Sequence, residues 1–422
     1  MCSIRLGKPS QGDVVSPESS AGRALPGASP EKMTGRERAL TAFDHREPDR
    51  VPLFELTIDN PTASYVLGRP TLCGFGGQVR GVARNEALIN GRIEAYHKQR
   101  VADEIALWRA LDLDVYPNAY PVPRHPLVPD RIGDNVWRTT DPTTGSWSVY
   151  RYSPKSDAYD EVDCTLRDEG LIALERLTEA LEADQPRLED WDFGPVDTLV
   201  RELRPDRLVM GVADVEIGST YCWAEHFLIG LIKAPELIHR YLDARLRNTL
   251  MLLEASLERG VDGAHGGYDW ASAQGPMFSP RHFEEFVFPR LKQITDLCHR
   301  YGVPYVKHTD GNIDLLLDGM IEAGVDAFQA IEPRAGMDIA RLKRVYGDRL
   351  TLIGNVDCAT VLVDGPVEAV RAQTREVIRM AAPGGGFLLS TSNSAHPGVE
   401  PAYYLAMLET AREVGRYPIE MT

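Results

Sequence analysis

Short apolar runs alternate with longer helical patterns through most of the chain. From residue 51 onward, runs rich in β-branched and other apolar residues are each followed by a stretch of helical periodicity. Eight such runs can be distinguished, at Val51–Leu56, Leu113–Tyr116, Arg207–Ala213, Gly263–Tyr268, Val303–Lys307, Ala327–Ile331, Leu350–Ile353 and Phe387–Ser390. Because eight β/α units close into a cylinder, the pattern predicts one (β/α)8 TIM-type barrel over residues 33–422.

Two segments interrupt this pattern. Residues 1–32 are rich in Ser, Pro and Gly and poor in large apolar residues, so they are predicted to be a disordered tail. Thr34 and Glu37 are spaced as in a capping box and predict the first helix. Residues 131–153 contain two aromatic strand patterns around a turn at 141–145, which predicts a β-hairpin inserted after strand 2. Such an insertion either walls a substrate pocket or decorates the surface.

Composition and charge restrict the function. The net charge of −16 and the absence of a Lys/Arg-rich run argue against a nucleic-acid partner. No apolar run is long enough to span a membrane, and no secretory signal is recognised, so we expect a cytoplasmic protein. The six scattered cysteines form no C-x-x-C pair and predict reduced, mostly structural thiols.

Polar residues gather where the predicted strands end. In a barrel of this type, catalytic groups lie at the C-terminal ends of the strands and in the loops that follow. The Asp residues at 262 and 326 repeat within a Gly-Val-Asp phrase at strand starts, so we interpret them as structural. The strand ends supply the substrate-binding candidates, namely Glu55, Asp59, Asp214, Asn312, Glu332, Asn355, Asp357, Asn393 and His396.

The segment after strand 5 carries the clearest chemistry. His308 and Asp310 are spaced i, i+2, so they can bind one metal ion or act as a base with its orienting acid. Alternatively, Asp310 only caps a helix beginning near Ile313. Asp269 lies in a Gly-flanked loop after strand 4, where we expect a functional carboxylate. The register leaves open whether His265 points into the barrel.

Several motifs together resemble the uroporphyrinogen decarboxylase-like superfamily, which includes the decarboxylase and the cobamide methyltransferases. The resemblance covers most of residues 33–418. It is carried by Met33-Thr-Gly-Arg-Glu-Arg-Ala-Leu, Glu47-Pro-Asp-Arg-Val-Pro52, Asp269-Trp-Ala-Ser-Ala-Gln-Gly-Pro-Met-Phe-Ser-Pro280, His308-Thr-Asp-Gly-Asn312, Gly354-Asn-Val-Asp357, the run Gly385 to Pro397 and the run Ala411 to Pro418. It implies a barrel enzyme with a small-molecule substrate, and it leaves a homodimer open because relatives often pair.

The chain departs from both well-known chemistries of this superfamily. The decarboxylase carries an arginine motif after strand 1 that holds substrate carboxylates, whereas residues 54–61 here contain no arginine. The methyltransferases bind zinc through a His-x-Cys motif after strand 5 and a cysteine after strand 8. Here His308 aligns with the histidine, Asp310 replaces the cysteine, and the strand 8 loop around Asn393 has none. The resemblance therefore implies a harder His/carboxylate site suited to an oxygen-bearing substrate.

Three functions follow from these observations. The leading hypothesis is a corrinoid-linked methyltransferase of the O-demethylase type, in which His308 and Asp310 bind about one zinc per chain, with Glu55 or Glu332 as further ligands, and a corrinoid protein is the partner. In this reading Asp269, His308 and Asp310 are the catalytic residues. The second is a metal-free carboxy-lyase acting on a tetrapyrrole or smaller carboxylate, with Asp269 or Asp310 stabilising a cation. The third is a non-catalytic corrinoid- or tetrapyrrole-binding barrel.

Overall fold

The computed structural model describes residues 33–420. The prediction of a disordered tail concerns residues 1–32, which lie outside the described residues. The first helix, α1 (Gly35–Phe43), begins with the predicted capping box, because the Thr34 side chain accepts from the Glu37 amide while the Glu37 side chain accepts from the Thr34 amide. This part of the sequence interpretation is confirmed.

A parallel sheet of seven strands curls around the core, as the alternation of apolar runs predicted. Its strands, in spatial order, are β1 (Val115–Ala119), β8 (Leu208–Val212), β9 (Ala264–Gly266), β12 (Tyr305–His308), β13 (Ala327–Gln329), β14 (Thr351–Val356) and β15 (Phe387–Thr391). Neighbours in space are also neighbours along the chain once the inserted strands are set aside, which is the topology of a TIM-type barrel.

The segment from Val51 to Ile58 fills the remaining position between β15 and β1. It pairs with β15 through one isolated parallel bridge, between Leu53 and Leu389, and a second such bridge joins Ile58 to Ala395 beyond the end of β15. On its other side, the Asp114 amide donates to the Leu53 carbonyl at 3.0 Å. The predicted (β/α)8 barrel is thus confirmed, with its first strand held by sparse bonds.

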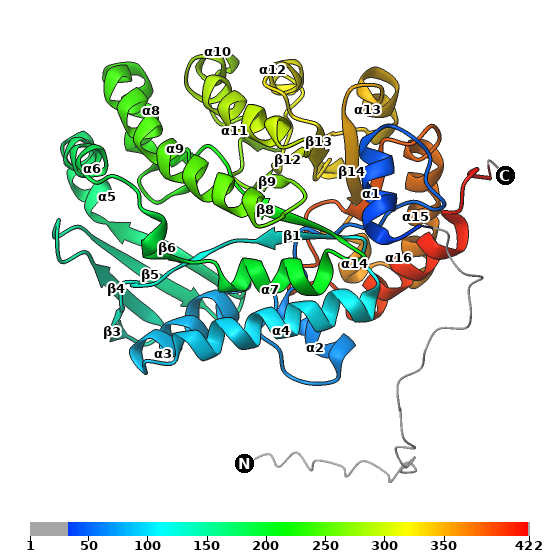
Figure 1. The fold of residues 1–422 in the computed structure, drawn as a ribbon, viewed down its shortest axis with the longest axis horizontal. Coiled ribbons are helices and arrows are strands. Elements are labelled where there is room, and N and C mark those ends of the chain that lie inside the picture. The colour runs from blue at the N-terminus through cyan, green and yellow to red at the C-terminus, as the bar shows by residue number, and fades with distance from the viewer. Residues whose placement is uncertain (1–32, 421–422) are drawn as a thin grey trace, which may run out of the picture. The chain divides into compact units, whose positions relative to one another are not determined.

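Helices follow the barrel strands along the sequence (Figure 1). Among the residues described, none of the helices is long and apolar enough to cross a membrane. The remaining α-helices are α2 (Asn60–Leu67), α3 (Arg84–Ile89), α4 (Ile93–Leu111), α5 (Thr165–Glu169), α6 (Leu171–Ala183), α7 (Gly194–Leu203), α8 (Ala224–Lys233), α9 (Pro235–Glu258), α10 (Pro280–His282), α11 (Phe288–Arg300), α12 (Leu317–Glu322), α13 (Ile339–Tyr346), α14 (Val361–Asp364), α15 (Val367–Ala381) and α16 (Pro401–Val414).

A small apolar cluster fills the inside of the barrel. Nearly every strand contributes to it, and α1 adds two alanines. Its members are Ala39, Ala42, Phe54, Leu56, Val115, Leu208, Met210, Val306, Ala327, Ile353 and Leu388. Side chains alternate between the two faces of a strand, so the neighbours of these residues point outward into a larger core beneath the helices. The apolar interior leaves the strand ends as the place for polar groups.

The insertion after β1 is larger than the predicted hairpin at residues 131–153. It is a four-stranded antiparallel sheet of β3 (Asp130–Gly133), β4 (Val136–Thr140), β5 (Trp147–Ser153) and β6 (Ala158–Cys164), which Figure 1 shows apart from the barrel strands. The predicted turn joins β4 to β5, where Asp141 Oδ1 accepts from the Thr143 amide at 2.7 Å. The sequence analysis missed β3 and β6 because β3 is short and β6 is mostly polar.

Aspartates tie neighbouring strands together at the N-terminal rim; Asp114 and Asp262 are buried, and Asp326 is partly exposed. Asp114, Asp262 and Asp326 each precede a strand, and their carboxylates accept from the amides of Leu53 (2.7 Å), Val209 (3.2 Å) and Tyr305 (2.7 Å), respectively. Each amide belongs to the preceding strand of the barrel. The structural interpretation of the Gly-Val-Asp phrase therefore agrees with these contacts.

Asp114 is the most heavily bonded of these carboxylates. Arg38 of α1 donates to its Oδ1 at 2.5 Å, and Arg50 donates to its Oδ2 at 2.8 Å. All three side chains are almost completely buried. The cluster joins α1, the first strand and β1 at the seam where the barrel closes.

We expect Asp114→Ala to lower the free energy of unfolding by about 3 kcal/mol, because it removes the buried carboxylate shared by two buried guanidinium groups and leaves them with the more exposed Asp49 and Asp112. Asp112→Ala is the matched control, since the Asp112 side chain is 60 % exposed while also pairing with Arg50 and Arg207. It should cost roughly 1 kcal/mol or less. Urea unfolding of both variants measures the difference, and equal losses would contradict the assignment of Asp114 as the closing contact.

Glu55 lies between Phe54 and Leu56 and points to the opposite face of the first strand. Its carboxyl group is fully buried and accepts from the Thr391 hydroxyl at 2.8 Å. Burial raises the pKa of Glu55 to about 8, although its hydrogen bonds with Thr391 oppose that shift. In the unfolded chain Glu55 has its ordinary pKa of about 4. The folded protein therefore keeps Glu55 protonated at pH values where the unfolded chain has released this proton.

This difference in pKa predicts pH-dependent stability. Because the folded-state pKa is raised, the contribution of Glu55 is fully present below about pH 4 and is lost as the pH rises through about 8. Glu55→Gln keeps the shape of the protonated form, so its urea midpoint should fall less than that of the wild type between about pH 5.5 and about pH 8.5. The exposed Glu376→Gln is the control. Parallel pH profiles for wild type and Glu55→Gln would refute this origin of the dependence.

Candidate metal centre and active site

Asp269, His308 and Asp310 come together at the C-terminal ends of adjacent strands. His308 ends β12, and Asp269 follows β9, the strand paired with β12. His308 Nε2 lies 3.6 Å from Asp269 Oδ1 and 4.0 Å from Asp310 Oδ1. These are the three residues that the sequence analysis assigned as catalytic, and one ligand atom from each lies within 4.8 Å of the others.

The surrounding bonds orient the His308 ring. Its Nδ1 contacts the side-chain oxygen of Gln329, whose amide nitrogen in turn donates to the Asn393 carbonyl at 2.9 Å. Since an amide oxygen only accepts, Nδ1 carries the proton and Nε2 keeps its lone pair. Burial lowers the pKa of His308, which favours the same neutral form. Nε2 is therefore presented to Asp269 and Asp310 as a ligand atom.

Asp310 has an oxygen that lacks a partner. Its Oδ2 accepts from the Asn393 amide nitrogen, whereas its Oδ1 is buried with no hydrogen bond among the described residues. Burial, Asp269 and Glu332 together raise the pKa of Asp310 to about 8. A buried, unpaired carboxylate oxygen is costly unless a proton or a cation accompanies it.

The three donors fit a small divalent cation. Zinc bonds to nitrogen and oxygen are about 2 Å long, so two ligands of one tetrahedral ion lie roughly 3.3 Å apart. The separations of 3.6 Å and 4.0 Å from His308 therefore require the ligand atoms to move inward by less than about 1 Å. One imidazole and two carboxylates form a hard donor set. Glu55, which the sequence suggested as a third ligand, is not part of this group, because its carboxyl group is bonded to Thr391. The third ligand atom comes from Asp269 instead.

The loop that carries Asp310 is held by its backbone. The Asp310 amide donates to Asp269 Oδ1 at 2.9 Å, and the Gly311 amide donates to Glu332 Oε2 at 3.0 Å. Gly311 has a φ of +82°, and a Cβ there would lie 2.6 Å from the Ala271 backbone. The alternative that Asp310 caps a helix near Ile313 is wrong, because α12 begins at Leu317.

The other predicted residues mostly support loops. Asp59 accepts from the Phe75 and Gly76 amides, and Asp357 accepts from the Ala359 and Thr360 amides. The remaining three bind backbone carbonyls, since Asn312 donates to Ala335, Asn355 donates to Ile331, and His396 Nε2 lies 2.8 Å from the Cys358 oxygen. Their role as substrate-binding groups stays a prediction.

A cavity of about 750 Å³ opens at the same end of the barrel. Asp214, His265 and Tyr268 contribute from the barrel side, and Tyr150 and Tyr159 contribute from the inserted sheet. The inserted sheet therefore walls this cavity, which Asp269, His308 and Asp310 do not line, and its role in holding substrate stays a prediction. His265 points inward, because its Nε2 lies 3.1 Å from Asn118 Oδ1, and burial lowers its pKa to about 3.

Acidic residues and tyrosines are the most numerous polar groups that line the cavity. Asp160, Glu161, Asp214 and Glu216 all contribute, whereas Arg80 is the one arginine among the described residues that line it. Asp214 is neutralised from behind by the buried Lys307, whose Nζ lies 2.6 Å from Asp214 Oδ2 and 4.3 Å from the Trp270 ring centre. This lining is poorly suited to a substrate with many carboxylates.

The sequence analysis missed the residues that support these groups. Gln329 and Lys307 lie on strands predicted as apolar runs, and a polar residue inside such a run was the signal that could have singled them out. Tyr221 and Tyr268, whose hydroxyls lie 3.0 Å apart at the cavity, come from segments with no distinctive motif. Their proximity depends on loop conformations that spacing does not specify.

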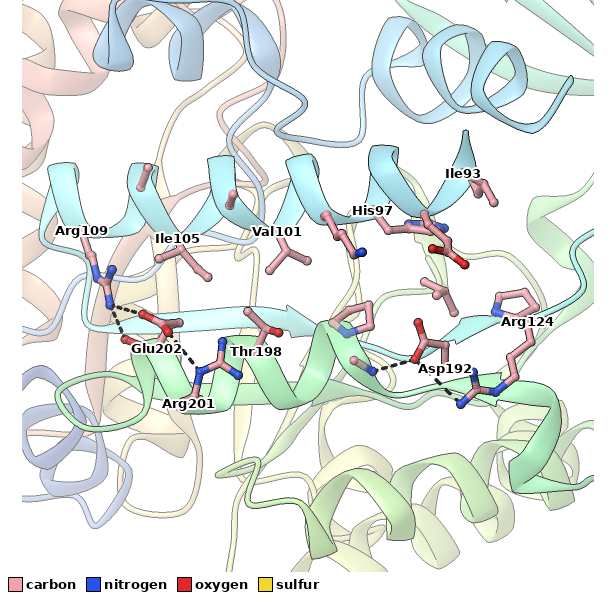
Figure 2. A pocket seen from close by; sticks show the side chains of 18 residues that line it. Ile93, His97, Val101, Ile105, Arg109, Arg124, Asp192, Thr198, Arg201 and Glu202 are labelled. Carbon is pink, nitrogen blue, oxygen red and sulfur yellow. Dashed lines mark hydrogen bonds and ion pairs between the residues drawn. The ribbon is translucent and has the colours of Figure 1, made fainter. Parts of the chain in front are cut away.

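A second cavity of about 750 Å³ lies between α4 and α7, and it contains none of the predicted site residues. Figure 2 shows Val101 and Ile105 of α4 facing Thr198 of α7, with charged pairs at the edges. One of these pairs joins Arg109 to Glu202 at 3.1 Å. Because the groove lies between helices and away from the strand ends, the candidate active site is the centre around His308.

Comparisons with known proteins give matches in the C-terminal half of the chain. Residues 217–414 match the family model "Uroporphyrinogen decarboxylase (URO-D)". The methylcobamide:CoM methyltransferase of Methanosarcina barkeri is 27 % identical over 195 residues, covering 44 % of this chain and 56 % of its own length. The uroporphyrinogen decarboxylase of Thioalkalivibrio sulfidiphilus is 26 % identical over 189 residues, covering 43 % and 50 %, respectively. The match thus spans about half the length of these relatives.

The fold extends beyond this sequence match. A solved methyltransferase from Methanosarcina mazei superposes with a TM-score of 0.59 and 19 % identity, covering 90 % of this chain and 99 % of that one. At this identity the likeness shows the fold alone. Asp269, His308 and Asp310 all lie inside the matched residues 217–414. Over residues 217–414 the chain is thus similar to uroporphyrinogen decarboxylase and its methyltransferase relatives, and over most of its length it shares the fold of the solved methyltransferase.

Proposed function

We propose that the chain is a corrinoid-linked methyltransferase of the O-demethylase type that uses a zinc ion held by Asp269, His308 and Asp310. The observation that carries this proposal is the buried Oδ1 of Asp310, which has no hydrogen bond within the described residues 33–420 and lies 4.0 Å from a His308 nitrogen with a free lone pair. A cation at this point would satisfy both atoms. Zinc supplies a Lewis acid that polarises an oxygen atom of a methyl donor.

The protein's own residues keep these ligand atoms in place. Gln329 holds the proton on His308 Nδ1, and Asn393 contacts both Gln329 and Asp310. Glu332 accepts from the Gly311 amide and adds negative charge beside Asp310. Rigid support of this kind preserves ligand geometry without the help of the substrate.

Hard ligands favour an oxygen-bearing methyl donor over a thiol. Carboxylates and imidazole are less soft than the cysteine ligands that the resemblance associates with thiol activation. The proposed reaction transfers a methyl group from an ether oxygen to the cobalt(I) of a corrinoid, and the released alkoxide takes up a proton. The relative from Methanosarcina barkeri is named for a methylcobamide substrate, which supports the corrinoid part of the proposal.

A carboxy-lyase is the second candidate, because other relatives are named uroporphyrinogen decarboxylase. Residues 54–61 contain no arginine, and the acidic lining of the cavity would repel a substrate with many carboxylates. These features favour methyl transfer, and direct assays separate the two.

The test of the proposed function is methyl transfer to free cob(I)alamin. Zinc-loaded protein is mixed with cob(I)alamin and a panel of methyl ethers, and the methylcobalamin spectrum is followed. His308→Ala and Asp310→Asn should each lower the initial rate by roughly 100-fold or more. His226→Ala is the control, because that histidine of α8 lies outside the group.

Two results would contradict the proposal. One is a methyl transfer rate that is the same in wild type, His308→Ala and Asp310→Asn. The other is stepwise loss of carboxyl groups from uroporphyrinogen without any methyl transfer, which would establish the carboxy-lyase. Cobalamin binding without turnover, measured by absorbance titration, would identify the non-catalytic binding protein.

A further inference from the structure

A second group of ligand atoms lies in the wall of the cavity, apart from the centre around His308. Cys164 ends β6 of the inserted sheet, and Cys222 lies in the loop between β8 and α8. Their sulfur atoms are 3.3 Å apart, and Cys222 Sγ is 3.3 Å from Glu161 Oε2. One ligand atom from each of the three residues lies within 4.8 Å of the others.

Two thiols and a carboxylate are packed together in this wall. Cys164 is buried, and both cysteines are free thiols. Cys222 Sγ contacts both Cys164 Sγ and Glu161 Oε2, so it connects the three groups. A divalent cation would replace the two thiol protons and bind the same three atoms.

The spacing and chemistry of the group suit zinc. Two thiolates bound to one tetrahedral zinc, with bonds of about 2.3 Å, lie roughly 3.8 Å apart, so the observed 3.3 Å requires only a small outward movement. Thiolates are soft ligands, in contrast to the oxygen-rich centre around Asp310.

The position of the group leaves one coordination site open. Glu161 and Cys222 both line the cavity of about 750 Å³, while Cys164 lies behind them. Three protein ligands with a fourth position facing a cavity are typical of zinc sites that bind an exchangeable ligand, whereas closed structural sites use four protein ligands.

We infer that Glu161, Cys164 and Cys222 form a zinc site whose fourth position opens into the cavity. The ion would join the inserted sheet to the barrel and would take water or a soft donor atom of a small molecule as its fourth ligand. This site is independent of the centre proposed above, because it shares no ligand with it. Glu161 and Cys164 also precede residues 217–414, so the match to the superfamily does not include them.

Cobalt(II) distinguishes the two centres, because only thiolate ligands give a near-ultraviolet sulfur-to-cobalt charge-transfer band. Full-length, metal-free protein is reduced with a phosphine and titrated with cobalt(II) under anaerobic conditions. We expect the band to saturate at about one equivalent and to disappear when zinc is added. His308→Ala should keep the band, whatever the outcome for methyl transfer.

Single substitutions locate the ligands. Cys222→Ser and Cys164→Ser should each abolish or strongly weaken the band, and Glu161→Gln should weaken cobalt binding by roughly 10-fold or more. Cys358→Ser is the matched control, since Cys358 is a buried cysteine outside the group. Cys222 is only partly buried, so its variant keeps the test informative if Cys164→Ser fails to fold, as judged by circular dichroism.

Three outcomes would overturn the inference. The first is a folded, reduced wild type that shows no thiolate band. The same conclusion holds if Cys164 and Cys222 form a disulfide and the protein still binds no cobalt after this disulfide has been reduced. The second is a band that persists in both cysteine variants. The third concerns the open position, because imidazole should shift the visible cobalt bands, and unchanged bands would show a closed site.

Discussion

The structure depends on how the barrel closes between its first strand and β1. The first strand pairs with β15 through one isolated bridge, so the buried carboxylate of Asp114, bonded to Arg38, Arg50 and the Leu53 amide, is the principal polar contact at this seam. Similar aspartates join two further strand pairs at the same rim. These ionic contacts lie at the N-terminal rim of the barrel. The polar groups at the C-terminal rim therefore do not have to stabilise the fold.

At the C-terminal rim, burial and charge are in conflict. Asp269, Asp310 and Glu332 lie close enough for the pKa of Asp310 to reach about 8, and Asp310 Oδ1 has no partner in the described part of the chain. The bonds of Gln329 and Asn393 nevertheless hold these groups together. An arrangement that costs stability and is still rigidly supported is typical of a site selected for chemistry, and a cation would resolve the conflict.

Much of this could be predicted from the sequence. The apolar runs predicted every barrel strand, and because parallel strands place their ends at one rim, the sequence also predicted that Asp269, His308 and Asp310 share that rim. Asp269 was expected there as a catalytic group and not as a metal ligand. Glu55 was misplaced as a ligand candidate, since the alternation of side chains turns it toward Thr391 on the outer face of the strand. The pairing of Cys164 with Cys222 could not be predicted either, because it depends on how a mostly polar insertion folds over the barrel. Spacing along the chain carries no information about such a contact.

The central claim is that Asp269, His308 and Asp310 hold one metal ion. The most direct measurement is a crystal structure of zinc-loaded protein, with anomalous diffraction recorded on both sides of the zinc absorption edge. The account predicts a zinc peak about 2 Å from His308 Nε2 and from one oxygen of each aspartate. A well-ordered centre with His308 and Asp310 in hydrogen-bond contact and no zinc peak between them, in crystals that bind zinc elsewhere, would contradict it.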